Sequence, residues 1–260
     1  MNIIRKEVTR QMKNDKDILY IVIPAYDEET NIQKCINDWY PIVEKNDGGG
    51  YSRLVIIDDG SKDNTFSIMQ RYAETRPLFH PLRKTNGGHG HTVLYGYRYA
   101  IKNGADFIFQ TDSDGQTNPA EFEQFWEARK KYDAVIGNRV VRGDGKNRKF
   151  VENTVCFLLH LIFGIKVKDA NAPFRLMKAS VVDKYIRKLP EDFNIPNIMF
   201  TTYFVYHHEN VKFIPITFKP RQGGTNAINM KKIIKIGWKA VGDFWRLRRE
   251  INDVESGDKR

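Results

Sequence analysis

The sequence predicts an α/β protein with a mostly parallel sheet flanked by helices. From Leu19 onward, short apolar runs alternate with stretches whose apolar residues recur at helical spacing, as in a series of β-α-β units. Four of these runs are apolar on both faces, as buried parallel strands are: LYIVIP, RLVIID, DFIFQT and DAVIGN. With 260 residues, 41% of them hydrophobic, the chain can bury the core of one large domain.

The helices and the last strand follow from spacing and capping residues. Apolar residues recur at helical spacing from Ile32 to Val43, after the capping candidates Asp27 and Thr30. Asn64 or Thr65 is expected to cap the helix after the second strand. Asn118 followed by Pro119 is typical of the start of a further helix, which carries Phe122, Phe125 and Trp126. The run VKFIPITFK is predicted to be a late strand.

The composition changes after Asn138. Residues 139–149 are rich in basic side chains and glycine, which predicts a mobile cationic loop. The longest nearly apolar run, from Val155 to Ile165, is shorter than the roughly 20 residues that cross a bilayer. A core helix is one interpretation of this run. The predicted organisation is a polar lead-in at 1–18, one domain at 19–225, and a basic amphipathic helix and tail at 226–260.

The net charge of +10 favours anionic partners, namely nucleic acid, nucleotide phosphates or an acidic membrane surface. A merely solvated basic surface is the alternative. No interleaving of aromatic and basic residues is evident, so nucleic acid is not expected as a partner. Cys35 and Cys156 lie far apart without zinc-ligand spacing, and the N-terminus has no apolar core of signal-peptide length. The expected location is therefore the cytoplasm.

The loop TDSDGQ carries the most specific chemistry. Asp112, Asp114 and Gln116 follow a predicted strand, at the end where open α/β sheets bind their ligands. Two carboxylates and an amide oxygen form a hard site suited to Mg²⁺ or Mn²⁺. The alternative is a capping cluster in which the aspartates bind backbone amides.

Two more strands are predicted to end in polar loops at the same edge. Asp58 and Asp59 close RLVIID, and Tyr26 follows LYIVIP. The Gly-rich stretch from Lys84 to Tyr97 opens a helix and is a candidate phosphate cradle, although it has neither the dinucleotide-binding nor the Walker pattern. His89 and His91 within it are candidate ligands, or pack the loop.

In chain order, the segments PAYDEE, DDGSKDNT, NGGHG, TDSDGQ, GNR, PFRLMK and PITFKPRQGG resemble the motifs of family 2 glycosyltransferases with the GT-A fold. Within that family the chain is most similar to dolichyl- and polyprenyl-phosphate sugar transferases. The resemblance covers residues 19–225. It implies a metal-dependent hexosyltransferase with a Rossmann-like GT-A sheet, a UDP- or GDP-sugar donor, inversion at the anomeric carbon, and Mg²⁺ or Mn²⁺. The segment from Phe150 to Ile165 resembles the amphipathic helices that such enzymes lay on the membrane interface.

The resemblance also implies roles for individual residues. The metal ligands would be Asp112, Asp114 and Gln116. The residues expected to act in catalysis are Asp114 and the arginines facing the donor and acceptor phosphates, Arg139, Arg148 and Arg221. Arg175 would lie near the site or form a structural ion pair. The nucleotide-sugar pocket would comprise Pro24, Ala25, Tyr26, Glu28, Asp58, Asp59, Lys84, Gly88, Asp112 and Ser113.

The kind of sugar acceptor is predicted from whether the enzyme has a carboxylate that can remove a proton from it. A sugar hydroxyl needs a carboxylate to take its proton, whereas a phosphate is already an anion. The helix expected to carry such acids reads IPNIMFTTYF, and Glu191 and Asp192 lie earlier, in a predicted turn. A polyprenyl phosphate is therefore favoured, for glycan or glycolipid synthesis by a peripheral enzyme at the inner face of the cell membrane.

Three alternatives stay open at this point. The enzyme could act on a hydroxyl of a lipid-linked oligosaccharide or polysaccharide, since GGTN replaces the family's usual Gly-x-Ser-Lys ending. It could be a nucleotidyltransferase, or a nucleic-acid-binding protein. Many similar enzymes continue into transmembrane helices that are not seen in this sequence, so binding to the bilayer would be peripheral or would use a membrane-anchored partner protein.

Overall fold

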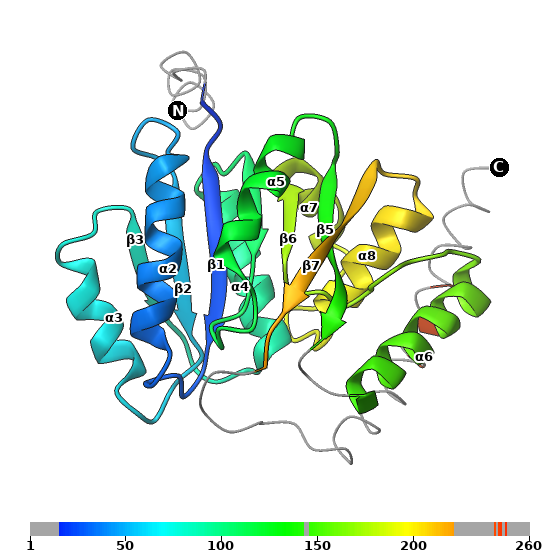
Figure 1. Ribbon diagram of the computed structural model, residues 1–260, viewed down its shortest axis with the longest axis horizontal. Helices are drawn as coiled ribbons and strands as arrows, with labels where there is room; N and C mark the ends of the chain where they lie inside the picture. The colour runs from blue at the N-terminus through cyan, green and yellow to red at the C-terminus, as the bar shows by residue number, and fades with distance from the viewer. Residues whose placement is uncertain (1–15, 143–145, 221–241, 243, 246–247, 249–260) are drawn as a thin grey trace.

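The computed structural model describes residues 16–142, 146–220, 242, 244–245 and 248, with the side chains of 141–148 left out (Figure 1). The elements in chain order are β1 (Leu19–Ala25), α2 (Ile32–Lys45), β2 (Arg53–Asp58), α3 (Thr65–Ala73), β3 (Phe79–Arg83), α4 (His89–Lys102), β4 (Phe107–Gln110), the 3₁₀ turn η1 (Pro119–Glu121), α5 (Phe122–Ala128), β5 (Ala134–Arg142), α6 (Lys146–Phe163), β6 (Arg175–Lys178), α7 (Ala179–Ile186), α8 (Pro196–Tyr206) and β7 (Val211–Phe218).

One sheet organises the described part of the chain. Its strand order is β3-β2-β1-β4-β6-β5-β7. β1 pairs in parallel with β2 and β4, and β3 pairs in parallel with β2. β6 is antiparallel to both β4 and β5, and β7 is parallel to β5. β1, β2, β4, β5 and β7 therefore end at the same edge, the lower edge in Figure 1.

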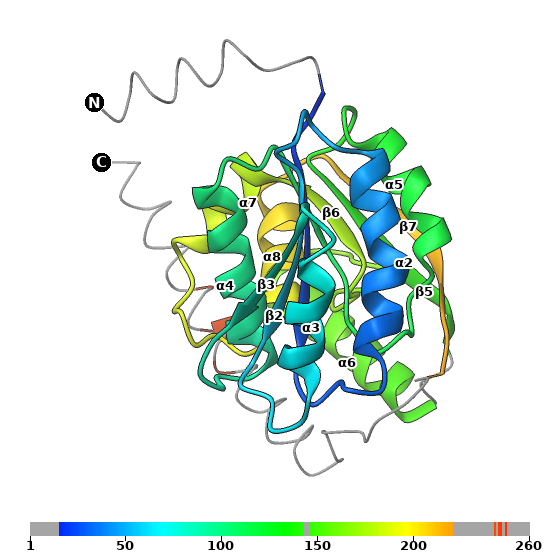
Figure 2. The same cartoon turned by 90° about the vertical axis from the view of Figure 1, so that its left-hand side faces the viewer.

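The sheet is buried between two layers of helices, which Figure 2 shows on either side of it. On β1, Leu19, Ile21 and Ile23 pack into the core under α2, α3 and α5. Tyr20 and Val22 alternate with them and join the opposite core with α4, α7 and α8. Because both faces are covered, the strands read as continuous apolar runs. The predicted α/β class and the four strands are confirmed.

Several local predictions were wrong or incomplete. β3 and β6 were not predicted, since FHPLR and RLMK are short and carry basic residues. Asp27 and Thr30 do not cap α2, whose N-cap position is Asn31. Asn64 does precede α3, but its side chain binds Glu29 and not the helix. Asn118 is confirmed as a cap, with its side chain accepting from the amide of Ala120.

The region after Asn138 is more regular than predicted. β5 continues to Arg142 and α6 begins at Lys146, so the predicted loop at 139–149 was wrong over most of its length. The basic helix predicted at 226–260 lies outside the described residues except at 242, 244–245 and 248. Among these, Phe244 is fully buried and its ring lies 6.3 Å from that of Phe163 on α6.

Candidate active site

The TDSDGQ loop leaves the carboxyl end of β4 at the lower edge of the sheet (Figure 1). Gly115 turns it with a positive φ of 72°, a conformation that side chains other than glycine rarely adopt. Asp114 is buried, and its Oδ1 accepts a hydrogen bond of 3.1 Å from the amide of Gln116. The capping alternative therefore holds for one oxygen of Asp114. A backbone amide of the loop thus fixes the carboxylate of Asp114.

Asp112 is held by side chains from two other positions. The Nε2 of His89, the first residue of α4, lies 3.0 Å from Asp112 Oδ1, and the Nε2 of Gln110 lies 3.3 Å from the same oxygen. Because a carboxylate only accepts, both nitrogens act as donors. Desolvation would lower the pKa of His89, but the nearby carboxylates, Asp112 above all, raise the pKa above its usual value.

Asp59 organises the Gly-rich loop at the end of β2. Its carboxylate accepts from the amides of Gly87 at 2.9 Å and Gly88 at 2.8 Å, and it pairs with the ammonium group of Lys84. Burial would raise the pKa of Asp59, but the bonds from Lys84 and the two glycine amides outweigh it and lower the pKa. The predicted phosphate cradle thus has two amides bound to a carboxylate of the protein itself.

The loops after β1 and β2 are joined to each other. Asp27 donates its amide to Ser61 Oγ at 2.9 Å, and accepts from the amide of Lys62 at 2.8 Å. Glu28 is buried and donates its amide to Thr65 Oγ1 at 2.9 Å. The strand register sets Pro24 opposite Ile57 and Ala25 opposite Asp58. The fully buried Asp58 accepts from the amide of Ser61 and pairs with Arg83.

Most residues predicted to bind the nucleotide sugar are thus brought to one edge. Tyr26, 38% exposed, stands at its surface, and Ser113 is buried in the β4 loop. The site is a rim of loops rather than a deep cavity. A pocket of only about 20 Å³ lies beside Asp112, Ser113 and Gly115, whereas a larger one of about 270 Å³ lies around Arg98 and Arg187, between α4 and α7 and away from this rim.

Gln116 ties the loop to the end of β7. Its Nε2 donates to the carbonyl of Lys219 at 2.9 Å, and its own carbonyl accepts from the amide of Lys219 at 2.7 Å. The side-chain bond uses the amide nitrogen of Gln116, whereas the predicted metal site requires the side-chain oxygen.

Arg139, three residues before the end of β5, has its side chain buried in an ion-pair cluster. Its Nε and an Nη each lie 2.7 Å from an oxygen of Asp169, and that Nη also lies 3.2 Å from Glu152 on α6. Glu152 in turn accepts from the amide of Ala170 at 2.7 Å. Arg139 thus joins β5, α6 and the segment before β6. Its predicted contact with a phosphate stays a prediction and requires the guanidinium to change partners.

The family model for Glycosyl transferase family 2 matches residues 20–186, more than half of the chain. This chain belongs to glycosyl transferase family 2. Over 168 residues it is 27% identical to an undecaprenyl-phosphate mannosyltransferase of Micrococcus luteus, covering 62% of this chain and 66% of that protein. Over 241 residues it is 22% identical to a polyprenol monophosphomannose synthase of Mycolicibacterium smegmatis, covering 89% and 88% of the two chains.

A solved structure supports the fold of this glycosyltransferase. The glucosyl-3-phosphoglycerate synthase of Mycobacterium tuberculosis, crystallised with Mn²⁺, UDP-glucose and phosphoglyceric acid, superposes with a TM-score of 0.63 at 16% identity. The superposition covers 89% of this chain and 79% of that one. The predicted GT-A sheet, Rossmann-like and mostly parallel, is confirmed.

Two carboxylates of the glycosyltransferase are candidate ligands for a cation. Asp112 and Asp114 offer hard oxygen ligands of the kind that Mg²⁺ and Mn²⁺ prefer. The described residues contain no group of three or more His, Cys, Asp or Glu side chains able to hold a metal. A cation here would therefore also need Gln116, water or the donor's own phosphates as ligands.

The other predicted arginines differ from one another. Arg175 is fully buried, with its guanidinium donating to the carbonyls of Ala172 at 2.8 and 3.0 Å and of Asn197 at 2.9 Å. Burial lowers its pKa. In this structure Arg175 binds backbone carbonyls, and no ion pair of Arg175 is formed among the described residues. Its expected place near the site stays a prediction. Arg221 and the side chain of Arg148 lie outside the described residues.

The helix expected to carry a base has none. α8 contains no acidic residue, and its positions from Pro196 to Phe204 are all buried. Glu191 and Asp192 are exposed in a turn before it, as predicted.

Sequence reasoning missed three residues of this glycosyltransferase: Gln110, Glu152 and Asp169. Gln110 carried a signal, since it is an amide at the end of an otherwise apolar strand. Asp169 and Glu152 carried none, because they meet Arg139 only through the fold.

Proposed function

We propose that this family 2 glycosyltransferase moves a sugar from a UDP- or GDP-sugar to a polyprenyl phosphate, for glycan or glycolipid synthesis. The observation that carries the proposal is the pair of carboxylates, Asp112 and Asp114, at the carboxyl edge of the sheet, in an enzyme whose helix α8 offers no base. The names of the two relatives, an undecaprenyl-phosphate mannosyltransferase and a polyprenol monophosphomannose synthase, support an acceptor of the same class.

The reaction would be a direct displacement. An oxygen of the acceptor phosphate attacks the anomeric carbon, and the bond to the nucleoside diphosphate breaks with its electron pair staying on the diphosphate. A bound Mg²⁺ or Mn²⁺ would neutralise the charge that develops on that leaving group. Asp112, Asp114 and the side-chain oxygen of Gln116 would hold the cation. Because the acceptor is already an anion, no residue has to remove a proton.

The remaining predicted residues have supporting roles in the proposal. Pro24, Ala25, Tyr26, Glu28, Asp58 and Asp59, with Lys84, Gly88 and Ser113, would line the donor pocket. Arg148 and Arg221 would face the acceptor phosphate. Arg139 would act there only after leaving Asp169, whereas in this structure it fastens α6 to the sheet.

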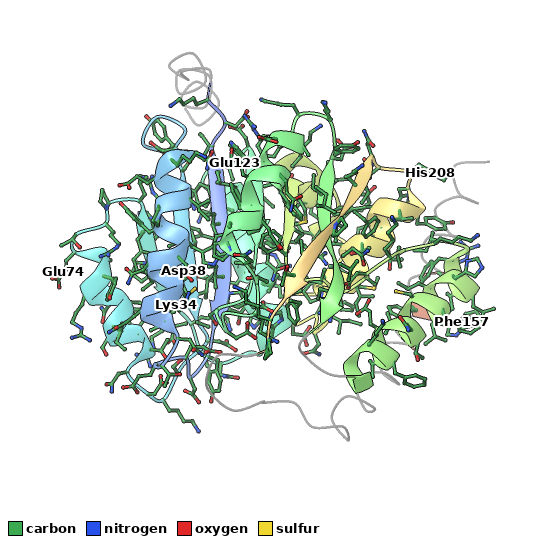
Figure 3. The ribbon with its side chains drawn as sticks, viewed as in Figure 1. Lys34, Asp38, Glu74, Glu123, Phe157 and His208 are labelled. Carbon is green, nitrogen blue, oxygen red and sulfur yellow. The ribbon has the colours of Figure 1, made fainter. Side chains whose placement is uncertain are left out.

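α6 provides a surface on which a lipid acceptor could arrive. Phe150, Phe157 and Leu161 are 73%, 63% and 70% exposed and lie 7 and 4 residues apart, on one side of the helix. Figure 3 shows Phe157 projecting from α6 away from the sheet. Its other side packs into the core through Leu159, Ile162 and Phe163. The core-helix expectation is met for this inner side, whereas the membrane-interface expectation stays a prediction.

In the described part of the chain, no helix is long and apolar enough to cross a membrane. An exposed apolar side on a surface helix suits the boundary between lipid headgroups and acyl chains. We therefore place α6 against the inner face of the cell membrane, where it would bind peripherally, alone or with a membrane-anchored partner protein.

The test is a transfer assay with Mn²⁺, undecaprenyl phosphate and a panel of UDP- and GDP-sugars, with the lipid-linked product detected by mass spectrometry. We expect one donor to give product, and Asp112→Ala or Asp114→Ala to reduce turnover at least about 100-fold without unfolding, because each removes a ligand of the cation. Circular dichroism would check the fold. Undiminished product in EDTA would contradict the metal, and product only with a lipid-linked glycan would move the acceptor to a sugar hydroxyl.

A further inference from the structure

Gln110 is unusual for its position. It is the last residue of β4, between Phe109 and Thr111, and none of its surface is exposed. Its Nε2 donates to Asp112 Oδ1 at 3.3 Å. Its Oε1 is buried with no hydrogen-bond partner among the described residues. A strand end buried this deeply would ordinarily carry an apolar side chain.

The orientation of this amide is decided by Asp112. If the amide were turned around, its oxygen would face the carboxylate oxygen, and two acceptors would repel each other. The donor therefore faces Asp112, and the acceptor is left unpaired in the interior. Buried unpaired acceptors are uncommon and call for a functional reason. The structure offers one such reason: the side-chain nitrogen of Gln110 gives Asp112 a hydrogen-bond donor in addition to that of His89.

His89 approaches the same oxygen from another element. It begins α4, its side chain is half-exposed, and its Nε2 lies 3.0 Å from Asp112 Oδ1. Two donors, one from β4 and one from α4, thus converge on a single carboxylate oxygen. Among the described residues no hydrogen bond to Asp112 Oδ2 is formed. Holding one oxygen fixes the carboxylate plane and leaves the other to a cation.

We propose that His89 and Gln110 are positioning residues that orient Asp112 for the cation of the transferase. This inference rests on the proposed function, because it assumes that Asp112 is a metal ligand. Hydrogen-bond partners of metal-ligating carboxylates typically change metal affinity 10- to 100-fold when removed. His89 and Gln110 touch the ligand and not the substrate, so metal affinity is the quantity they should change.

The experiment measures Mn²⁺ affinity, with and without UDP, from the electron paramagnetic resonance signal of free Mn²⁺. We expect Gln110→Met and His89→Phe each to weaken Mn²⁺ binding about 10- to 100-fold. His89→Gln keeps a donor and should restore most of the affinity. The control is His80→Gln, since His80 bonds to Tyr99 and lies on β3, away from the loop. It should bind Mn²⁺ as the unmodified protein does.

Asp112→Asn separates the two ways in which this inference can fail. If Asp112→Asn weakens Mn²⁺ binding while His89→Phe and Gln110→Met do not, the positioning role is overturned and the proposed function stands. If Asp112→Asn leaves Mn²⁺ binding unchanged, the metal part of the proposed function is overturned and the positioning role falls with it. Should Gln110→Met fail to fold, the half-exposed His89 still decides the matter.

Discussion

At the carboxyl edge of the sheet, β2 and the β4 loop carry acids that bind backbone amides, whereas β5 carries an arginine that binds acids from distant segments. Asp58 and Asp114 accept from amides three and two residues ahead of them. Arg139 reaches Asp169 and Glu152, 30 and 13 residues away in the sequence. The acids of the parallel half, β3-β2-β1-β4, are thus held by backbone amides together with single basic side chains such as Arg83 and Lys84. The arginine of the mixed half, β6-β5-β7, joins β5, α6 and the segment before β6.

The difference indicates that the two halves use their charged residues for different purposes, a contrast called here the division between the halves. Acids bound mainly by backbone amides can be replaced one at a time with modest structural damage, which suits residues that meet a changing ligand. A cation bonded to two buried carboxylates of distant segments cannot be removed without leaving charge unpaired in the interior. Each of the following predictions tests this division by substituting one or two residues and comparing the variant with a matched exposed residue.

The largest loss of stability is expected from Arg139→Met. The substitution leaves the Asp169 carboxylate, only 2% exposed, without the guanidinium that neutralises it. Breaking a buried pair from one side costs about 3–5 kcal/mol of unfolding free energy. Urea denaturation would measure it. The control is Lys45→Met, since the pair of Lys45 with Glu123 is exposed on both sides and is expected to contribute about 0.5 kcal/mol or less. Equal losses for the two variants would contradict the division.

Asp59→Asn should have an intermediate effect, because Asp59 accepts two amides and an ammonium from the Gly-rich loop. Hydrogen bonds to a charged group contribute about 1.5–3 kcal/mol, so we expect a loss of about 2 kcal/mol at pH 7. The pKa of Asp59 is lowered in the folded protein, so its contribution is complete above the ordinary value of 3.8. It is lost only as the pH falls below that value and through the folded pKa.

Urea midpoints at pH 7, 5 and 3.5 would check this. The difference between Asp59→Asn and the unmodified protein should be the same at pH 7 and 5 and smaller at pH 3.5. The control is Asp38→Asn on α2, whose partner Lys34 lies one turn away (Figure 3), and which should change stability by about 0.5 kcal/mol or less. A difference that already closes between pH 7 and 5 would show that Lys84 and the glycine amides do not lower the pKa of Asp59.

The same division explains which parts of the protein could be predicted from its sequence. Asp112, Asp114 and Asp59 were found because each lies within four residues of the end of an apolar strand, and parallel strands bring such ends to one edge. The partners of Arg139 were not found, because 30 residues and a change of strand direction separate it from Asp169. β6 spans four residues, too few to show a period, and nothing in RLMK specifies antiparallel pairing. The basic residues that suggested a loop after Asn138 instead belong to β5 and α6.

The double variant Phe157→Ser, Leu161→Ser on α6 is expected to change the stability least. It is also expected to weaken membrane binding strongly. Both side chains are largely exposed, so the unfolding free energy should change by about 0.5 kcal/mol or less. Partitioning onto vesicles that contain anionic lipid should weaken about tenfold or more, since apolar area that would enter the bilayer is lost. Co-sedimentation with such vesicles would measure it.

Tyr51→Ser is the matched control for this double variant, because Tyr51 is 52% exposed and lies two residues before β2, at the opposite edge of the sheet. It should leave vesicle binding unchanged. If the α6 variant binds vesicles as the unmodified protein does, α6 does not face the membrane, and Arg139 would then fasten it for another purpose. If binding is lost while stability is kept, the ion pairs of the mixed half have a clear use. Together with the buried side of the helix, they hold the exposed apolar residues of α6 at the surface.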